Sequence, residues 1–203
     1  MDITHITVTD VTNIGDPFVL RVGGTYYLYA TSFKDGFDCR TSDDLVHWSE
    51  PRMAYTRGER SFGYTDFWAP EVVFHEGKYI MHYSARRKGD DTLLIGVAVS
   101  DRPEGPFVDV TDGPMFDFGY AAIDGHVLRD GKDSYLFYSR DCSQYVVEGR
   151  RESHIYAVRL DDSLTRTVGE PVHISGPDCP WETVTGDTRW NAGPFIVKRD
   201  GIY

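Results

Sequence analysis

The chain has 203 residues, 40% of them hydrophobic, so it is long enough to fold as one domain around a sizeable core. Its 13 tyrosines and 11 phenylalanines favour strands over helices. A net charge of −11 argues against nucleic acid or an anionic membrane surface as a partner.

The first residues and the cysteines bear on the compartment in which the protein works. Residues 1–4 lack the basic and apolar regions of a signal peptide, and no apolar run is long enough to span a bilayer. The three cysteines are odd in number and far apart, which suggests neither a disulfide framework nor a zinc site (Cys39, Cys142 and Cys179). We therefore expect a cytoplasmic protein without a membrane partner.

The first strand-rich unit is expected at about residues 13–55. An apolar segment that opens at Asp16-Pro17-Phe18 leads through a glycine turn into an aromatic strand at residues 25–31. This order predicts a β-hairpin. A third strand is expected at residues 39–42, followed by a polar turn and an edge strand.

The same order of apolar opening, glycine turn and aromatic strand then recurs. The second unit is expected at about residues 66–116 and the third at about 120–176, and a fourth begins at about 190 and continues to 203. The three later units open with similar short segments: Ala69-Pro70-Glu71, Asp124-Gly125-His126 and Ala192-Gly193-Pro194.

Repeats of roughly 50–70 residues, each with about four strands, are typical of β-propeller blades. No stretch shows sustained helical periodicity, and a β-sandwich with accidental internal similarity is the weaker alternative. We therefore predict an all-β propeller with three blades and the start of a fourth. Since such a fragment cannot close into a ring, we expect either a longer protein or self-association through the open edge.

The unit openings and their neighbours form a specific set of motifs: Gly15-Asp16-Pro17-Phe18, Trp68-Ala69-Pro70-Glu71, Ile123-Asp124-Gly125-His126 and Gly193-Pro194-Phe195-Ile196. As a set they resemble glycoside hydrolase family 43, a family of five-bladed β-propeller glycosidases. The resemblance extends from about Asn13 onward and leaves out about two later blades. It implies that the first strand of each blade lines a central funnel.

The resemblance also implies roles for three positions. Asp16 would be the general base that activates water, and Asp124 would hold the general acid and tune its pKa. The acid itself would be a glutamate in a Glu-Gly-Pro motif, where this chain has Ala192. Inverting glycosidases need a base and an acid about 6.5–9.5 Å apart, and a third carboxylate nearby keeps the acid protonated.

Ala192 has two interpretations. It is either a natural loss, which would leave a carbohydrate-binding relative without hydrolysis, or a replacement of a native glutamate. The intact pair Asp16 and Asp124 favours the second interpretation, because an abandoned site has less reason to keep them. Glu182 lies ten positions before Ala192 and is expected to be structural or peripheral.

Further candidates for substrate binding flank the unit openings. Glu71 could hydrogen-bond sugar hydroxyls or be a structural carboxylate, and Trp68 and Trp190 could stack on a sugar ring or fill space between blades. His126 could reach the funnel, although a histidine paired with a neighbour is the plainer interpretation. Arg140 could orient a carboxylate.

We therefore predict an inverting glycosidase for arabinose- or xylose-containing plant oligosaccharides, of the α-L-arabinofuranosidase or β-xylosidase type, impaired at residue 192. The alternatives are a sugar-binding pseudoenzyme and a protein-docking propeller, and the latter leaves the paired aspartates unexplained. No cofactor or metal site is predicted; calcium in the central channel occurs in some relatives through a histidine of a later blade. The sugar, the linkage and the choice of exo- or endo-action stay open.

Overall fold

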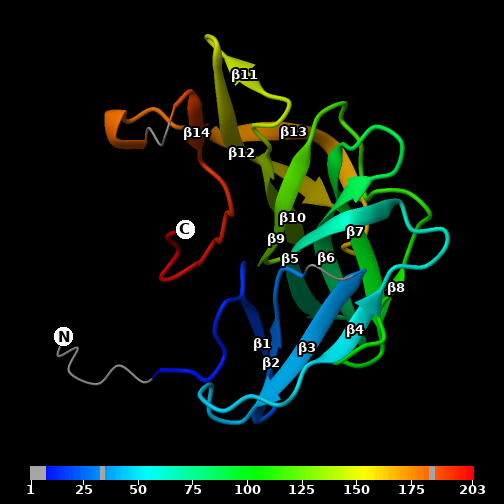
Figure 1. The fold of residues 1–203 in the computed structure, drawn as a ribbon. Helices are drawn as coiled ribbons and strands as arrows, with labels where there is room; N and C mark the ends of the chain where they lie inside the picture. Colours follow the sequence, from blue (N-terminus) through cyan, green and yellow to red (C-terminus); the bar gives the residue numbers. More distant parts are fainter. Residues whose placement is uncertain (1–7, 33–34, 183–185) are drawn as a thin grey trace.

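The computed structural model describes residues 8–32, 35–182 and 186–203, and nearly all of its regular structure is β-strand. The first sheet contains β1 (Phe18–Val22), β2 (Thr25–Tyr29), β3 (Gly36–Ser42) and β4 (Arg52–Thr56) in that order. The second sheet contains β5 (Gly63–His75), β6 (Lys78–Arg87), β7 (Leu93–Ser100) and β8 (Val108–Asp109). Figure 1 shows these sheets as neighbouring antiparallel units.

The third sheet is larger and carries two short additions. Its main strands are β9 (Ala122–Asp130), β10 (Asp133–Arg140), β12 (Arg150–Leu160) and β13 (Thr167–Ser175). The short strand β11 (Val146–Val147) pairs antiparallel with β12, and β14 (Thr188–Trp190) pairs parallel with it. The parallel pairing brings the chain back towards the centre of the molecule (Figure 1).

Each sheet begins with one of the expected hairpins. The β5–β6 turn places Glu76 and Gly77 at positive φ, as a two-residue hairpin turn of type I′ requires. The β1–β2 and β9–β10 turns use Gly23 and Gly131 at positive φ. The glycines therefore stand where the strands reverse, and the prediction of these three hairpins is confirmed.

The prediction of an all-β chain is also confirmed. The one helical element in the described part of the chain is the short 3-10 turn η1 (Pro180–Glu182), and no described helix is long and apolar enough to cross a membrane. Of the expected fourth unit, Trp190 belongs to β14, and residues 191–203 form no strand. Arg199 and Ile202 form only an isolated bridge around Gly201.

Two apolar cores hold the three sheets together. The core between the first and second sheets is aromatic, with Phe37, Tyr55, Phe67 and Tyr83 all at 1% exposure or less. The core between the second and third sheets is mainly aliphatic and includes Ile95, Leu136, Tyr138, Val158 and Leu164. Since each sheet packs on the next, the starts of β1 and β9 and the middle of β5, at Ala69, are held around one centre.

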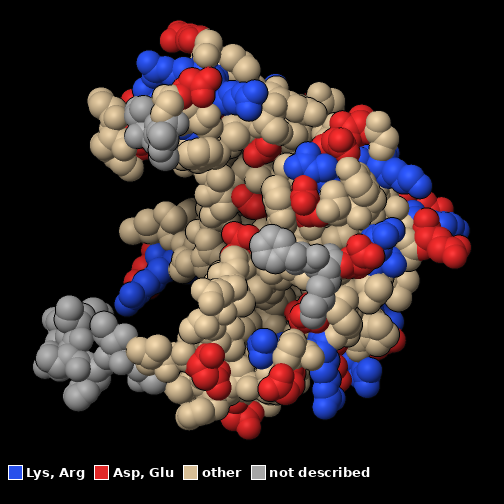
Figure 2. Space-filling view, viewed as in Figure 1, with Lys and Arg blue, Asp and Glu red and all other residues tan. Residues whose placement is uncertain are grey.

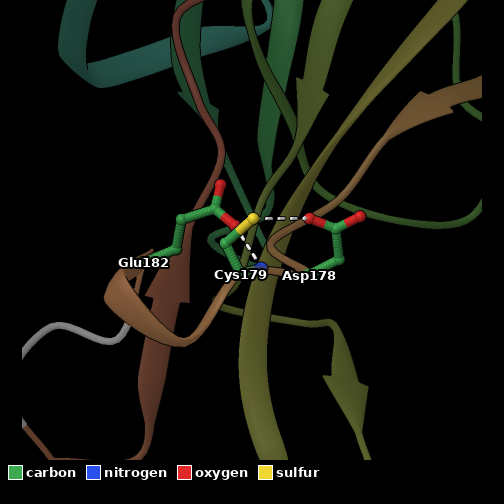
Figure 3. Close-up of side chains that lie close together, drawn as sticks. All are labelled: Asp178, Cys179 and Glu182. Carbon is green, nitrogen blue, oxygen red and sulfur yellow. Dashed lines mark hydrogen bonds between the residues drawn. The ribbon is translucent and has the colours of Figure 1, made fainter.

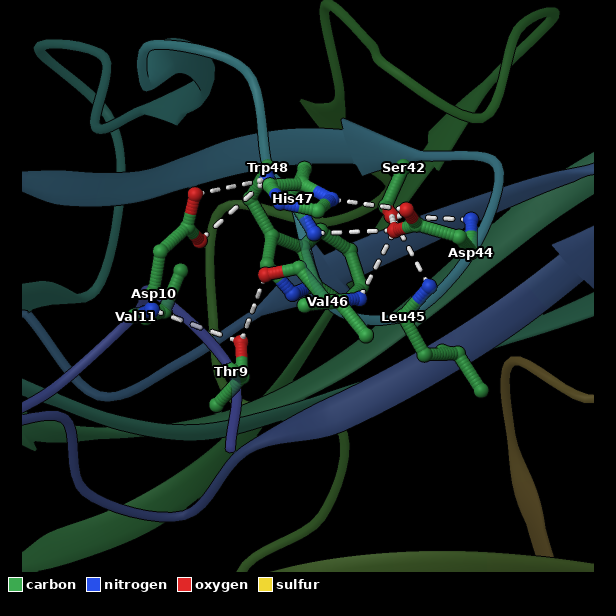
Figure 4. A network of polar contacts seen from close by, with 9 residues as sticks. All are labelled: Thr9, Asp10, Val11, Ser42, Asp44, Leu45, Val46, His47 and Trp48. Atoms are coloured by element: carbon green, nitrogen blue, oxygen red, sulfur yellow. Dashed lines mark hydrogen bonds and ion pairs between the residues drawn. The ribbon is translucent and has the colours of Figure 1, made fainter. Parts of the chain in front are cut away.

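A polar network fixes the outer end of the first sheet to the N-terminal segment (Figure 4). The Asp44 carboxylate accepts the N–H groups of Val46 and His47 at 2.8 Å each, which closes the turn after β3. The Asp10 carboxylate accepts the Trp48 N–H, and the Thr9 hydroxyl donates to the Val46 carbonyl. This network lies away from the molecular centre and contributes to the fold.

Candidate active site

One unusual backbone conformation recurs where the chain enters each unit. Asp16, Ala69, Asp124 and Gly193 have φ angles of 48°, 44°, 59° and 67°. Positive φ is uncommon for residues other than glycine, and all four of these residues also line one pocket, so we take them as equivalent positions. By this measure Gly193 is the equivalent of Asp16 and Asp124, and Ala192 lies one residue before it.

The three unit entrances and the last segment meet in one pocket of about 160 Å³. It is lined by Asp16, Pro17, Phe18, Ala69, Pro70, Glu71, Asp124, Gly193, Pro194 and Phe195. In Figure 2 the molecule is hollowed beside the last residues of the chain, and acidic side chains border the hollow. The structure thus brings together the two aspartates that lie 108 positions apart in the sequence.

Asp16 is held by a hydroxyl group of its own sheet. Thr31, just beyond the end of β2, donates its hydroxyl hydrogen to Oδ2 of Asp16. The same hydroxyl oxygen accepts the N–H of Ala69 at 3.0 Å, and the Thr31 N–H donates to the Gly15 carbonyl at 3.0 Å. The carboxylate of Asp16 is therefore linked to the second sheet through one side chain.

Asp124 is held in the same way. Its N–H donates to the Ser84 hydroxyl at 2.9 Å, and its Oδ2 accepts a long hydrogen bond from the Ser139 hydroxyl at 3.4 Å. The Ser139 hydroxyl oxygen in turn accepts the N–H of Gly193 at 3.0 Å. The pairing of β9 with β10 shifts register next to Ser139, as bulges do at sites where a side chain is re-aimed.

The electrostatic environment of Asp124 disfavours its charge. Burial, followed by the negative charges of Asp16 and Asp141, raises its pKa to about 7. The Gly193 N–H and the Ser139 hydroxyl lower this pKa and so offset part of that rise. Near neutral pH Asp124 therefore exchanges between its neutral and charged forms.

Glu71 and His126 form a hydrogen-bonded pair beside the aspartates. The carboxylate of Glu71 lies 2.8 Å from Nδ1 of His126, and the His126 side chain is 8% exposed. Its ring packs on Phe195 with 4.6 Å between the ring centroids, and Nε2 lies 3.4 Å from the Ile196 carbonyl. Glu71 therefore lines the pocket, while the His126 ring is in contact with Glu71, Phe195 and the Ile196 carbonyl.

Ala192, which is exposed, does not line this pocket, and neither do three other predicted residues. Trp68 packs against the small core formed by Leu93, Ala121 and Ile123. Trp190 in β14 is 48% exposed and donates its indole N–H to the Cys142 sulfur at 3.1 Å. The Arg140 guanidinium lies between two rings, 4.4 Å from the Tyr120 centroid and 3.8 Å from that of Tyr145.

Glu182 belongs to a local turn rather than to the pocket (Figure 3). Its Oε2 accepts the N–H of Cys179 at 2.7 Å and so closes η1, while the Cys179 thiol lies 3.3 Å from Oδ1 of Asp178. One potential ligand atom from each of these three residues lies within 4.8 Å of the others. Both hydrogen bonds, and the closeness of the three residues, are explained by the turn itself.

The sequence interpretation missed the hydroxyl groups that hold the aspartates. Thr31 lies just beyond β2, two residues after Tyr29, whereas Ser84 and Ser139 lie within β6 and β10, directly after Tyr83 and Tyr138. A hydroxyl residue one or two positions after a tyrosine of each aromatic segment was therefore a visible signal. It was missed because serine and threonine are ordinary residues at strand ends.

Comparisons with known proteins give the family context. The chain matches the model of glycosyl hydrolases family 43 over residues 11–203. It is 30% identical to an extracellular endo-α-(1→5)-L-arabinanase of Thermotoga petrophila, covering 91% of this chain and 42% of that protein. It is 26% identical to a probable arabinan endo-1,5-α-L-arabinosidase A of Aspergillus flavus, covering 90% of this chain and 56% of that protein.

Solved structures agree with the sequence matches. A thermostable family-43 glycoside hydrolase superimposes with a TM-score of 0.88 at 39% identity, covering 96% of this chain and 63% of that one. An endo-arabinase from Bacteroides thetaiotaomicron superimposes with a TM-score of 0.81 at 25% identity, covering 97% and 70%. The chain spans about half the length of the curated relatives that it matches. These matches confirm the propeller-type fold, and the chain belongs to glycosyl hydrolase family 43.

Proposed function

We propose that this chain carries the water-activating part of an inverting glycosidase site for arabinose- or xylose-containing oligosaccharides. The observation that carries the proposal is the meeting of Asp16 and Asp124 in one pocket, from equivalent positions at the entrances of two sheets. Inverting hydrolysis uses a general base and a general acid around one cavity. Asp16 would supply the base, and Asp124 would be the further carboxyl group that tunes the acid.

The two aspartates would have different roles in the reaction. Asp16 accepts the Thr31 hydroxyl at Oδ2, and its Oδ1 accepts no hydrogen bond from the described residues, so Oδ1 is the atom that would take a proton from water. Asp124 has a raised pKa, as expected of a carboxyl group crowded by burial and by other carboxylates. Its negative field would also keep a neighbouring acid protonated.

Ala192 fits this scheme as the vacant position of the general acid. It directly precedes Gly193, whose N–H binds Ser139 and which lines the pocket with Asp124. A methyl group cannot donate a proton to a leaving sugar oxygen. We therefore propose that hydrolysis of natural glycosides by this chain is impaired at residue 192.

The names of the relatives guide the choice of sugar. The curated relatives include an endo-α-(1→5)-L-arabinanase, an exo-α-(1→5)-L-arabinofuranosidase and a xylosidase/arabinosidase. Arabinan-derived oligosaccharides are therefore the first substrates to test, with xylosides second. The pocket carries no basic side chain among its lining residues, which suits a neutral sugar.

The test compares leaving groups. Dinitrophenolate departs without protonation, so a dinitrophenyl arabinofuranoside or xyloside requires the base alone. We expect turnover of such a substrate, almost none of alkyl glycosides, and a gain of about 10²–10⁴-fold on alkyl glycosides in the variant A192E. The variant D16N should lose turnover on both. Absence of turnover and of sugar binding in A192E would overturn the proposal.

Ala192 itself favours one competing function, a sugar-binding pseudoenzyme. This alternative predicts that arabino- or xylo-oligosaccharides bind the chain while A192E still fails to cleave even the dinitrophenyl substrate. Calorimetric titration with these oligosaccharides, run beside the assay, separates the two functions.

A further inference from the structure

A hydroxyl group links each sheet to the next at the centre of the molecule. Thr31 accepts the N–H of Ala69, Ser84 accepts that of Asp124, and Ser139 accepts that of Gly193, at 2.9–3.0 Å. In every case the donor is the residue with positive φ at the next entrance. The same hydrogen bond, from a backbone N–H to a hydroxyl group of the preceding unit, therefore recurs from unit to unit.

Two of these three hydroxyl groups have a second bond. Thr31 also donates to Oδ2 of Asp16, and Ser139 donates to Oδ2 of Asp124. Ser84 stands in the sheet whose entrance is Ala69, which has no carboxylate to accept its hydrogen. The donated bond is therefore present where the entrance residue is an aspartate.

We infer that Thr31 and Ser139 are positioning residues, each of which fixes an aspartate of the site to the backbone of the following unit. This inference deepens the proposed function and rests on it for the catalytic consequence. Neither hydroxyl needs to touch the substrate. Their effect passes through the carboxylates of Asp16 and Asp124.

The chemistry of a hydroxyl group suits this task. It donates one hydrogen bond and accepts another at the same time, whereas valine and alanine do neither. With Oδ2 of Asp16 occupied by Thr31, rotation of the carboxylate is restricted and Oδ1 is left for water. Ser139 is fully buried and Thr31 is partly buried, so water replaces their bonds poorly.

The bond from Thr31 also sets the distance between two sheets. Because its acceptor side is occupied by the Ala69 N–H, a displacement of the second sheet would pull on the group that holds Asp16. Displacements of about 1 Å are enough to lower enzymatic rates by about 10²-fold. Through Thr31, the packing of the first sheet on the second therefore fixes the position of the Asp16 carboxylate.

The first experiment isolates Asp16 with the dinitrophenyl substrate, which needs the base and no acid. We expect Thr31→Val to lower kcat by about 10²-fold with KM nearly unchanged, and Thr31→Ser to restore most of the rate. Thr25→Val is the matched control, since Thr25 donates to Asp43 at 3.1 Å at the opposite end of β2. A Thr31→Val rate within about twofold of the Thr25→Val rate would overturn the role of Thr31.

The second experiment needs no activity. Carboxyl ¹³C NMR follows the titration of Asp124 in the chain with Ser139→Ala and with Ser84→Ala. Since the Ser139 hydroxyl stabilises the charged carboxylate, its removal should move the Asp124 midpoint upward from about 7, while Ser84→Ala, which removes no bond to the carboxylate, should move it less. Equal midpoints in both variants would overturn the role of Ser139.

The two readouts separate a failure of this inference from a failure of the proposed function. If neither the chain nor A192E turns over any pentoside, the glycosidase proposal fails while the NMR titration still decides whether Ser139 positions Asp124. If turnover is present and both hydroxyl variants behave as their controls, the site is catalytic and the inference is wrong.

Discussion

At the scale of single residues, the environment that raises the pKa of Asp124 also makes its charged form destabilise the fold. Its carboxyl group lies in a partly buried position next to Asp16 and Asp141, where a charge is unfavourable. The unfolded chain has no such constraint, and there an aspartate titrates near its ordinary value. The free energy of unfolding is therefore lower at pH values where Asp124 is ionised.

This opposition predicts a pH-dependent effect of Asp124→Asn. The folded-state pKa of about 7 lies above the unfolded value, so the contribution of Asp124 to stability is fully present below about pH 4 and is lost as the pH rises through 7. Asparagine does not titrate. The stability of Asp124→Asn relative to the native chain should thus increase by on the order of 2 kcal/mol between pH 5 and pH 8.

Thermal unfolding of both proteins at a series of pH values measures this difference. Asp112→Asn is the control, since Asp112 is exposed and forms only a surface ion pair with Arg60 at 3.4 Å. The control should show no such trend. A relative stability that stays constant from pH 5 to pH 8 would contradict the raised pKa.

At the scale of elements, strand β7 passes so close to a ring that one position admits only glycine. A Cβ atom at Gly96 would lie 2.5 Å from Cζ of Tyr83 and 2.7 Å from the ring of Phe62. Tyr83 is fully buried, and its hydroxyl donates to Asp109 at 2.7 Å, so the ring cannot withdraw freely. The close approach of β7 and β6 thus depends on a missing side chain.

We expect Gly96→Ala to destabilise the protein by about 1–3 kcal/mol, the usual effect of overpacking a core. Gly113→Ala is its matched control, because a Cβ atom at Gly113 would meet nothing within 4 Å and its φ is not positive. Urea denaturation of the two variants gives the comparison. Similar midpoints for both would show that the second sheet relaxes around the added methyl group.

Some features of these strands could be predicted from the sequence, and others could not. Glycine turns followed by aromatic strands predicted the three hairpins, because those patterns depend on local backbone preference and alternation. The register shifts along β5, between Gly63 and Glu71, have no local signature. They arise where β5 must both pair with β6 and bring Ala69 to the centre, which is a tertiary requirement.

The site was predictable to a similar extent. The shared openings placed Asp16 and Asp124 at equivalent strand starts, and the structure lines one pocket with both. The indole of Trp68 faces an inter-sheet core instead, and no pattern in the sequence distinguishes the two faces at a strand start. Hydrogen bonds such as Ser139 to Gly193 join residues 54 positions apart and become visible only in the fold.

At the scale of the whole molecule, the packing of one sheet on the next sets the geometry of the site. Phe67 on β5 is fully buried against Phe37 and Tyr55 of the first sheet, at ring-centroid distances of 5.9 and 6.0 Å. Its carbonyl accepts the N–H of Ser32 at 3.0 Å, next to Thr31. One residue therefore joins the aromatic core to the segment that holds Asp16.

Removal of this ring should affect both stability and the site. We expect Phe67→Ala to lower the free energy of unfolding by about 3–5 kcal/mol, because a large cavity opens between two sheets. Phe74→Ala, on the same strand but at a side chain that is 50% exposed, should lower it much less. Urea unfolding checks both values, and turnover of the dinitrophenyl substrate in native conditions checks the site. If Phe67→Ala is destabilised yet keeps the native turnover, the position of Asp16 depends on the hydrogen bonds of Thr31 alone and not on the aromatic core behind it.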